Sequence, residues 1–124
     1  MNEIGIMEVG GFRVGHAQDL EGGTGCTVLR CERMSPARLA LGVGEKSARP
    51  DAAMAYRACE NAGYAAPAQG NVGAGTGCSI GKYRGMERAM KSGFGCCAFQ
   101  AGDLKAGALV AVNALGDVYG PDGG

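Results

Sequence analysis

The residues best suited to chemistry lie in a glycine-rich stretch, residues 70–82 (GNVGAGTGCSIGK). Five of its thirteen residues are glycine, and its one charged residue is the terminal Lys82. Glycine has no Cβ atom, so a ligand or another backbone segment can approach closely. The pKa of a lysine falls readily on burial, which suits a lysine to active-site roles. The stretch is a candidate binding loop, and the alternative is a surface loop followed by a solvated lysine.

Two phosphate-binding motifs fail on this stretch. The motif G-x-x-x-x-G-K-[ST] would place glycine where Thr76 stands and Ser or Thr where Tyr83 stands. The dinucleotide motif G-x-G-x-x-G would need glycine at Cys78 or Ile80. A nucleotide-binding domain therefore remains only a weak alternative, which titration with ATP and NAD would test.

A second polar candidate, Asn113, ends a strongly apolar segment. Residues 107–113 (GALVAVN) are typical of a strand, and a side-chain amide at its end needs hydrogen-bond partners. Lacking partners there would cost about 1–3 kcal/mol. Asn113 either caps a turn or directs its N–H₂ group at a reaction centre as an oxyanion donor. Spacing alone favours the turn.

The cysteines and the single histidine indicate neither a metal site nor a cysteine nucleophile. The six cysteines form no C-x-x-C pair, and the only histidine, His16, lies in a distant N-terminal segment. We expect the cysteines to be reduced and to act as small buried hydrophobic residues, with Cys96 and Cys97 on opposite faces of a strand. His16 is expected to be structural.

Composition limits the class of protein. The chain has 124 residues, enough for one domain, with 46% apolar residues, 24 glycines and no tryptophan. Twelve basic and twelve acidic residues cancel, so no net field attracts nucleic acid or anionic lipid. No apolar run is long enough to cross a bilayer, and the N-terminus does not resemble a signal peptide. We expect a cytoplasmic protein without a cofactor.

Local patterns predict a mixed α+β fold. Residues 12–16 and 26–31 alternate as an antiparallel strand pair, and residues 95–100 and 107–113 as two further strands around a turn at Gly102–Asp103. Pro50 opens a helix with a broad alanine face that ends at Gly63. We expect this helix to pack on the sheet that contains residues 107–112, with Ala55, Ala58 and Cys59 buried and Arg57 and Glu60 exposed. Residues 34–37 resemble a loop, and residues 86–91 a short turn or helix.

In this order, the motifs resemble the L-aminopeptidase/D-esterase family, which includes β-peptidyl aminopeptidases and a nylon-oligomer hydrolase. The similar segments cover most of the chain: FRVGH at 12–16, TGCTV at 24–28, RPDAA at 49–53, GNVGAGTG at 70–77, GK at 81–82, MKSGFG at 90–95 and GALVAVNALGDV at 107–118. The resemblance implies part of an αββα sandwich, similar to the N-terminal-nucleophile hydrolases. It implies that residues 1–124 form a single partial domain resembling an incomplete α-subunit.

The same resemblance implies a mechanism. Such proteins cleave themselves before a Ser or Thr, whose freed α-amine, with a pKa of about 8, serves as the base. Asn113 stands where the family has its oxyanion-hole asparagine, and Lys82 resembles its active-site lysine. The substrate would be a small peptide or amide, the partner a β-subunit-like remainder, and the assembly a homo-oligomer. The residues that would face the substrate are Gly73, Ala74, Gly75, Thr76 and Gly77.

The chain departs from the family in two places. Between Ala37 and Arg38 the family carries an additional segment with a glycine-rich motif and a helix, and the chain ends at Gly124 before the expected Asn-Ser or Asn-Thr cleavage point. The implied enzyme therefore has no nucleophile in this chain, which would be inactive by itself. If residues were omitted at 37–38, these two Cα atoms should lie well beyond the ~3.8 Å of a trans peptide. A continuous peptide there would favour the alternative, a non-catalytic structural or binding module.

Overall fold

The computed structural model describes residues 1–32, 37–42, 47–120 and 122–123. Within these residues the chain is a small α+β protein with one α-helix and three antiparallel sheets. Of the loop predicted at residues 34–37, residues 34–36 lie outside the described ranges. Residue 37 begins a strand. The elements, with short 3₁₀ helices labelled η, are β1 Asn2–Ile4, η1 Ile6–Val9, β2 Phe12–Asp19, β3 Thr24–Cys31, β4 Ala37–Gly42, α1 Ala52–Glu60, η2 Gly73–Gly75, β5 Ser79–Ile80, η3 Lys82–Arg84, η4 Met86–Arg88, β6 Met90–Lys91, β7 Phe94–Ala101 and β8 Leu104–Ala111.

The first sheet has the order β2-β3-β4, and the predicted N-terminal hairpin forms its core. Strands β2 and β3 pair antiparallel from Phe12 opposite Cys31 to Asp19 opposite Thr24. Both strands are longer than predicted, because the turn is confined to residues 20–23. Strand β4 pairs with β3 on its other side, through Leu29 opposite Ala37 and Val28 opposite Arg38.

The join between Ala37 and Arg38 lies inside strand β4. The two residues pair with consecutive residues of β3, so the chain passes through the join as one strand. The absence of a family segment between Ala37 and Arg38 stays a prediction.

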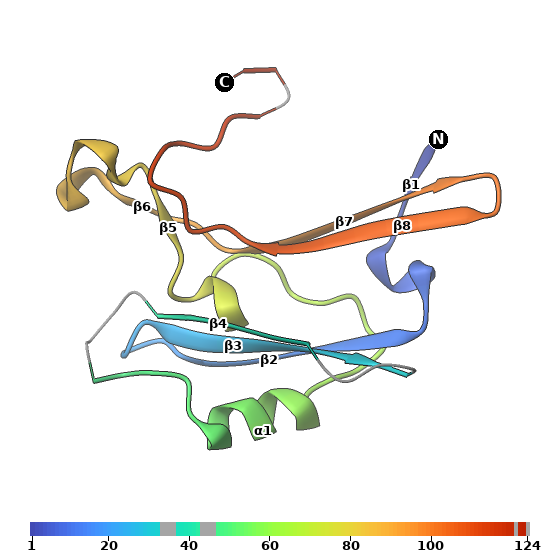
Figure 1. Cartoon of the computed structure of the whole chain (residues 1–124), viewed down its shortest axis with the longest axis horizontal. Coiled ribbons are helices and arrows are strands. Elements are labelled where there is room, and N and C mark those ends of the chain that lie inside the picture. Colours follow the sequence, from blue (N-terminus) through green and yellow to red (C-terminus); the bar gives the residue numbers. More distant parts are fainter. Residues whose placement is uncertain (33–36, 43–46, 121, 124) are drawn as a thin grey trace.

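Helix α1 covers one face of the first sheet (Figure 1). Asp51 is its N-cap and accepts a hydrogen bond from the Met54 backbone N–H at 2.7 Å. Met54 and Ala58 are buried against Ala17, Cys26 and Val28 of β2 and β3. The prediction that this helix packs on the sheet containing residues 107–112 is therefore wrong, since that segment belongs to the second sheet.

Helix α1 packs on the first sheet because a glycine in that sheet lets the helix approach closely. A Cβ atom on Gly15 of β2 would lie 2.0 Å from the Ala58 carbonyl oxygen, so the helix rests directly on the strand backbone. Ala58 is buried as predicted, whereas Ala55 and Cys59 are only half-buried. Arg57 and Glu60 are exposed, which confirms that part of the prediction.

The helix ends at Glu60, three residues before the predicted stop at Gly63. The chain leaves the helix early because it bonds to the side of β2. The Asn61 side chain donates to the His16 carbonyl at 2.9 Å, and the Gly63 N–H donates to the Val14 carbonyl at 3.3 Å. These two bonds tie the end of α1 to the first sheet.

The second sheet has the order β1-β7-β8 and confirms the predicted C-terminal hairpin. Strands β7 and β8 pair from Phe94 opposite Ala111 to Ala101 opposite Leu104, around the turn at Gly102–Asp103. Strand β8 starts earlier and ends earlier than predicted, so Asn113 follows the strand. Phe94 and Ala98 are buried on the inner face, 2% and 0% exposed.

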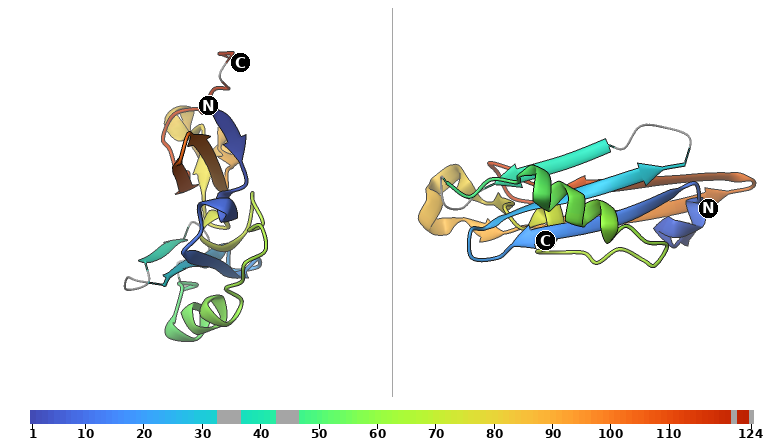
Figure 2. Two further views of the ribbon diagram at one scale, coloured as in Figure 1. Left: turned by 90° about the vertical axis from the view of Figure 1, so that its right-hand side faces the viewer. Right: turned by 90° about the horizontal axis from the view of Figure 1, so that it is seen from below.

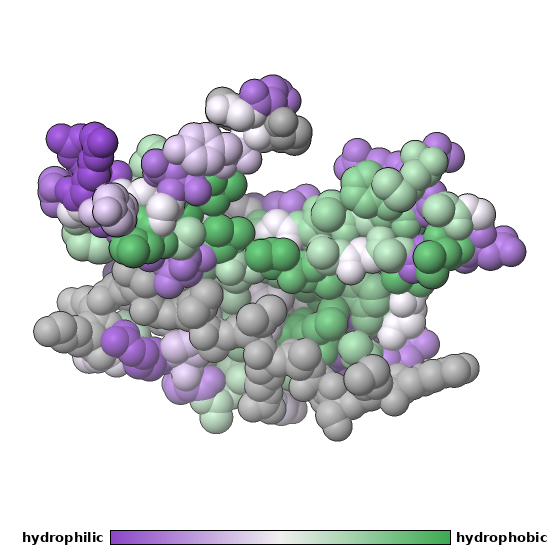
Figure 3. All heavy atoms as spheres, turned by 45° about the horizontal axis from the view of Figure 1, so that its top comes forward, coloured by the Kyte–Doolittle hydropathy of each residue, from purple (hydrophilic) through white to green (hydrophobic). Residues whose placement is uncertain are grey.

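The outer face of the second sheet is uncovered. Leu104 is 69% exposed, Val110 47% and Phe99 40%. Figure 3 shows apolar residues gathered over this side of the molecule. Cys97 also lies on this face and is exposed, so the prediction of buried cysteines is wrong for it. Cys26 and Cys78 are buried, and Cys31, Cys59 and Cys96 are half-buried.

The glycine-rich stretch lies between the two sheets, so that α1, the first sheet, this segment and the second sheet follow one another (Figures 1 and 2). It contacts both sheets through backbone atoms. A Cβ on Gly25 of β3 would lie 2.0 Å from the Gly73 carbonyl oxygen, and a Cβ on Gly75 would lie 2.2 Å from the Phe94 nitrogen of β7. The glycines therefore let one segment pack against both sheets at backbone distance.

No helix in the described ranges is long and apolar enough to span a bilayer.

Candidate functional site

Asn113 and Lys82 lie in direct contact. The Lys82 Nζ donates to the Asn113 Oδ1 at 2.5 Å, and the Ser79 backbone N–H donates to the same oxygen at 3.3 Å. Both partners are more than thirty residues away in sequence. The amide thus does not act as a cap for the turn that follows it, which spacing alone had favoured.

Local backbone geometry produces this contact. Gly81 precedes η3 with a φ of 70°, a left-handed conformation that suits glycine. Its N–H donates to the Gly116 carbonyl at 2.9 Å, which fastens the start of η3 to the segment after Asn113. At the other side, the Val112 N–H donates to the Gly93 carbonyl at 3.1 Å and continues the β7–β8 pairing up to Asn113.

The two donors determine how the Asn113 amide is oriented. An ammonium group and a backbone N–H can only donate, so the amide atom that they contact is the oxygen. The Nδ2 group is then the part of the side chain left to donate to something else. Asn113 is exposed and Lys82 half-buried, so this N–H₂ group and a positive charge lie next to each other at the protein surface. Such a pair suits stabilisation of a developing oxyanion.

The predicted substrate-facing residues occupy different places. Gly73, Ala74, Gly75 and Thr76 are buried between the sheets. All four of their backbone N–H groups are already used. The Gly73 N–H donates to the Gln18 Oε1 at 3.0 Å, the Ala74 N–H to the Thr27 Oγ1 at 2.9 Å, and the other two to carbonyl groups within residues 72–73. Gly77 lines a cavity. The structure thus provides a packing reason for Gly73 and Gly75, where the sequence suggested substrate approach.

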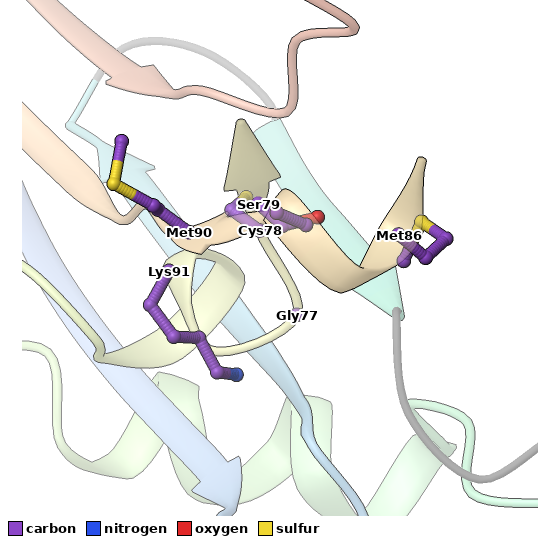
Figure 4. A pocket seen from close by; sticks show the side chains of 7 residues that line it. Gly77, Cys78, Ser79, Met86, Met90 and Lys91 are labelled. Carbon is purple, nitrogen blue, oxygen red and sulfur yellow. The ribbon is translucent and has the colours of Figure 1, made fainter. Parts of the chain in front are cut away.

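The cavity beside Gly77 has a volume of about 190 Å³ and is shown in Figure 4. The short β5–β6 pair forms one side of it, with Ser79 opposite Lys91 and Ile80 opposite Met90. Sequence reasoning missed the methionines here, because it interpreted residues 86–91 as a turn without a site. The cavity is lined by Gly77, Cys78, Ser79, Met86, Ala89, Met90 and Lys91.

Cys78 lies at this cavity but is not a competent nucleophile. Its Sγ donates to the Ala74 carbonyl at 3.3 Å, and the residue is 0% exposed. Burial raises the pKa of the Cys78 thiol, and the nearby charges of Lys82 and Lys91 oppose that rise. A raised pKa keeps the thiol protonated at neutral pH, whereas a nucleophile needs the thiolate.

A second, polar cavity has a volume of about 310 Å³ and is lined by Gly81, Tyr83, Arg84, Arg88 and Asp117.

His16 is structural, as the sequence suggested. Its Nδ1 is 2.9 Å from the Thr27 Oγ1, and its ring meets that of Phe94 edge to face at 4.9 Å. Burial lowers the pKa of His16, and the backbone of Ala68 acts in the opposite direction. The residue lies at the contact between the first sheet and β7.

Within the described ranges, no three His, Cys, Asp or Glu side chains lie close enough to hold a metal ion.

Comparison of the chain with known protein families, with curated proteins and with solved structures finds no match.

Proposed function

We propose that this chain is part of an autoprocessing aminopeptidase or amidase that hydrolyses small peptide or amide substrates. Asn113 would donate to the oxyanion, and Lys82 would hold the amide and add positive charge. The nucleophile would come from a β-subunit-like remainder of the protein. The observation that carries the proposal is the contact of the Lys82 ammonium and the Ser79 N–H with one oxygen of Asn113.

The chemistry follows from that contact. When a nucleophile attacks an amide carbonyl, the carbonyl oxygen becomes negatively charged, and a fixed donor about 2.7–3.1 Å away stabilises it. The Asn113 Nδ2 group is such a donor, because its orientation is set before substrate arrives. A side chain held by two bonds loses little further freedom when it binds the oxyanion, so more of the interaction energy lowers the barrier.

The arrangement of layers supports the same proposal. Helix α1, the first sheet and the second sheet form three successive layers (Figure 1). An αββα sandwich has a further helical layer on the outer face of its second sheet. In this chain that face is apolar and uncovered, with Leu104 69% exposed. We therefore propose that another part of the protein covers this face and completes the fold. The complete protein would be a cytoplasmic homo-oligomer.

The alternative is a non-catalytic structural or binding module with a related fold. In this module strand β4 would run through residues 37 and 38 without the additional segment that the family carries there. Such a module would keep the contact of Lys82 with Asn113 as a structural link between η3 and the end of β8.

Turnover by the complete protein separates the two. We expect self-cleavage, visible by mass spectrometry, and hydrolysis of L-leucine p-nitroanilide. Replacing Asn113 by Ala should lower kcat by about a hundredfold or more, with the melting temperature nearly unchanged. Asn2→Ala, at an exposed position of β1, is the matched control and should leave kcat unchanged. An inactive wild-type protein, or an Asn113→Ala variant with normal kcat but lowered stability, would support the structural module.

A further inference from the structure

The cavity beside Gly77 adjoins the Asn113–Lys82 contact through a single residue. Ser79 lines the cavity, and its backbone N–H donates to the Asn113 Oδ1 at 3.3 Å. A group bound at the Asn113 amide is therefore only a few bonds away from the cavity. No sequence motif indicated this neighbourhood, because β5 and β6 are each two residues long.

The side chains around the cavity are apolar and adaptable. Met86 and Met90 lie on either side of β5, and Ala89 lies between them in sequence (Figure 4). Methionine is flexible and polarizable, so it adjusts to apolar groups of different shapes. Both methionines are largely exposed, at 61% and 58%, so they are free to close over a ligand.

The lysine that lines the cavity uses its ammonium group in a backbone hydrogen bond. The Lys91 Nζ donates to the Thr76 carbonyl at 2.8 Å, and Figure 4 shows this side chain directed away from Met86 and Met90. The volume of about 190 Å³ corresponds to roughly six water molecules at about 30 Å³ each, enough for an aliphatic side chain. A charged side chain would lose its hydration here, and among the described lining side chains the Ser79 hydroxyl is the one polar group without a hydrogen-bond partner.

We infer that this cavity binds the apolar side chain of the substrate residue that carries the scissile carbonyl. This inference rests on the proposed function, which places that carbonyl at Asn113. The substrate class is then narrowed to peptides or amides whose acyl residue resembles leucine or methionine. An acidic acyl residue is disfavoured, because one neutral hydroxyl, that of Ser79, does not offset the lost hydration of a carboxylate.

Methyl NMR of the complete protein tests occupancy directly. The probes are L-leucine amide and L-aspartic acid α-amide, added to protein labelled with ¹³C-methyl methionine. The leucine probe should shift the signals of Met86 and Met90, assigned by substitution to leucine, and leave that of Met7 unchanged. The aspartic acid probe should shift neither. Unmoved Met86 and Met90 signals, or equal shifts at Met7, would overturn the inference.

Selectivity provides the second test. Met90→Glu should lower kcat/KM for L-leucine p-nitroanilide by about tenfold or more, because an apolar contact is replaced by a charge. It should raise kcat/KM for the L-lysine analogue. Leu20→Glu, at an exposed apolar position in the turn between β2 and β3, is the control and should change neither value. Unchanged selectivity in Met90→Glu would contradict the assignment.

The two proposals fail differently. If Asn113→Ala keeps its kcat while leucine amide still shifts Met86 and Met90, the cavity binds apolar ligands and the oxyanion role is refuted. If Asn113→Ala loses kcat while the methionine signals stay fixed, the catalytic role holds and the cavity assignment is refuted.

Discussion

Replacing Gly75 by alanine tests whether the glycine-rich stretch serves packing or substrate approach. A Cβ atom at this position would lie 2.2 Å from the Phe94 nitrogen and 2.6 Å from the Gly70 carbonyl oxygen, where ordinary contact begins at 3.4 Å. Gly75 has no positive φ, so alanine would not strain its own backbone. The effect of the substitution is therefore a purely steric one between two backbone segments.

The segments that must move are held by hydrogen bonds. The Gly70 N–H donates to the Phe94 carbonyl at 2.7 Å, and the Phe94 N–H donates to the Gly70 carbonyl at 2.8 Å. Overpacking alone costs about 1–3 kcal/mol, and each weakened hydrogen bond adds about 0.5–1.5 kcal/mol. We expect the free energy of unfolding to fall by about 2–6 kcal/mol. For a chain of this length that lowers the melting temperature by roughly 8–24 °C.

Thermal melts followed by circular dichroism measure this change. Gly116→Ala is the matched control, because its added Cβ would meet no atom within 4 Å, and its melting temperature should stay within about 2 °C of the wild type. If Gly75→Ala melted like the wild type but raised KM for the p-nitroanilide substrate, the packing argument would be wrong. The loop would then face substrate, as the sequence first suggested.

Two further predictions concern titration and reactivity. Because burial lowers the pKa of His16 below 6.5, the unfolded chain binds a proton that the folded chain excludes, and the free energy of unfolding should fall as pH drops from 7.5 to 5.5. Urea melts of the wild type and of His16→Gln measure this. If the free energy of unfolding falls equally in both proteins, His16 is not the cause. The exposed Cys97 should react with N-ethylmaleimide well before the buried Cys26 and Cys78, as peptide mass spectrometry would show. Faster labelling of Cys78 would contradict its burial.

The two hairpins could be predicted from the sequence because their signals are local. A strand is indicated by alternation among adjacent residues, as in 12–16 and 26–31, and a turn by a short local sequence such as Gly102–Asp103. The packing partner of α1 could not be predicted in this way. An alanine face fits any sheet that allows close approach, and the selecting feature was one glycine, Gly15, on a different strand.

The candidate site shows the same division. Position and residue type identified Lys82 and Asn113 as candidates. Only the resemblance assigned both to one active site, because their contact joins residues more than thirty positions apart in the sequence. The glycines at 73 and 75 fit two interpretations for a physical reason: close approach of a ligand and close approach of a backbone both require the absence of Cβ. Met86 and Met90 had no signal, since their importance depends on a two-residue strand pair.

The uncovered strand β8 affects the solubility of the protein. It forms the edge of its sheet, and its one charged residue, Lys105, donates to the Glu8 carbonyl at 3.0 Å. Protein sheets usually protect such edges with free charges, prolines or bulges. The chain also exposes 7840 Å² of surface, against roughly 6,200 Å² for a typical folded monomer of its mass. Produced alone and concentrated, it should form strand-paired aggregates, and an added lysine at Ala106 or Ala108 should keep it in solution.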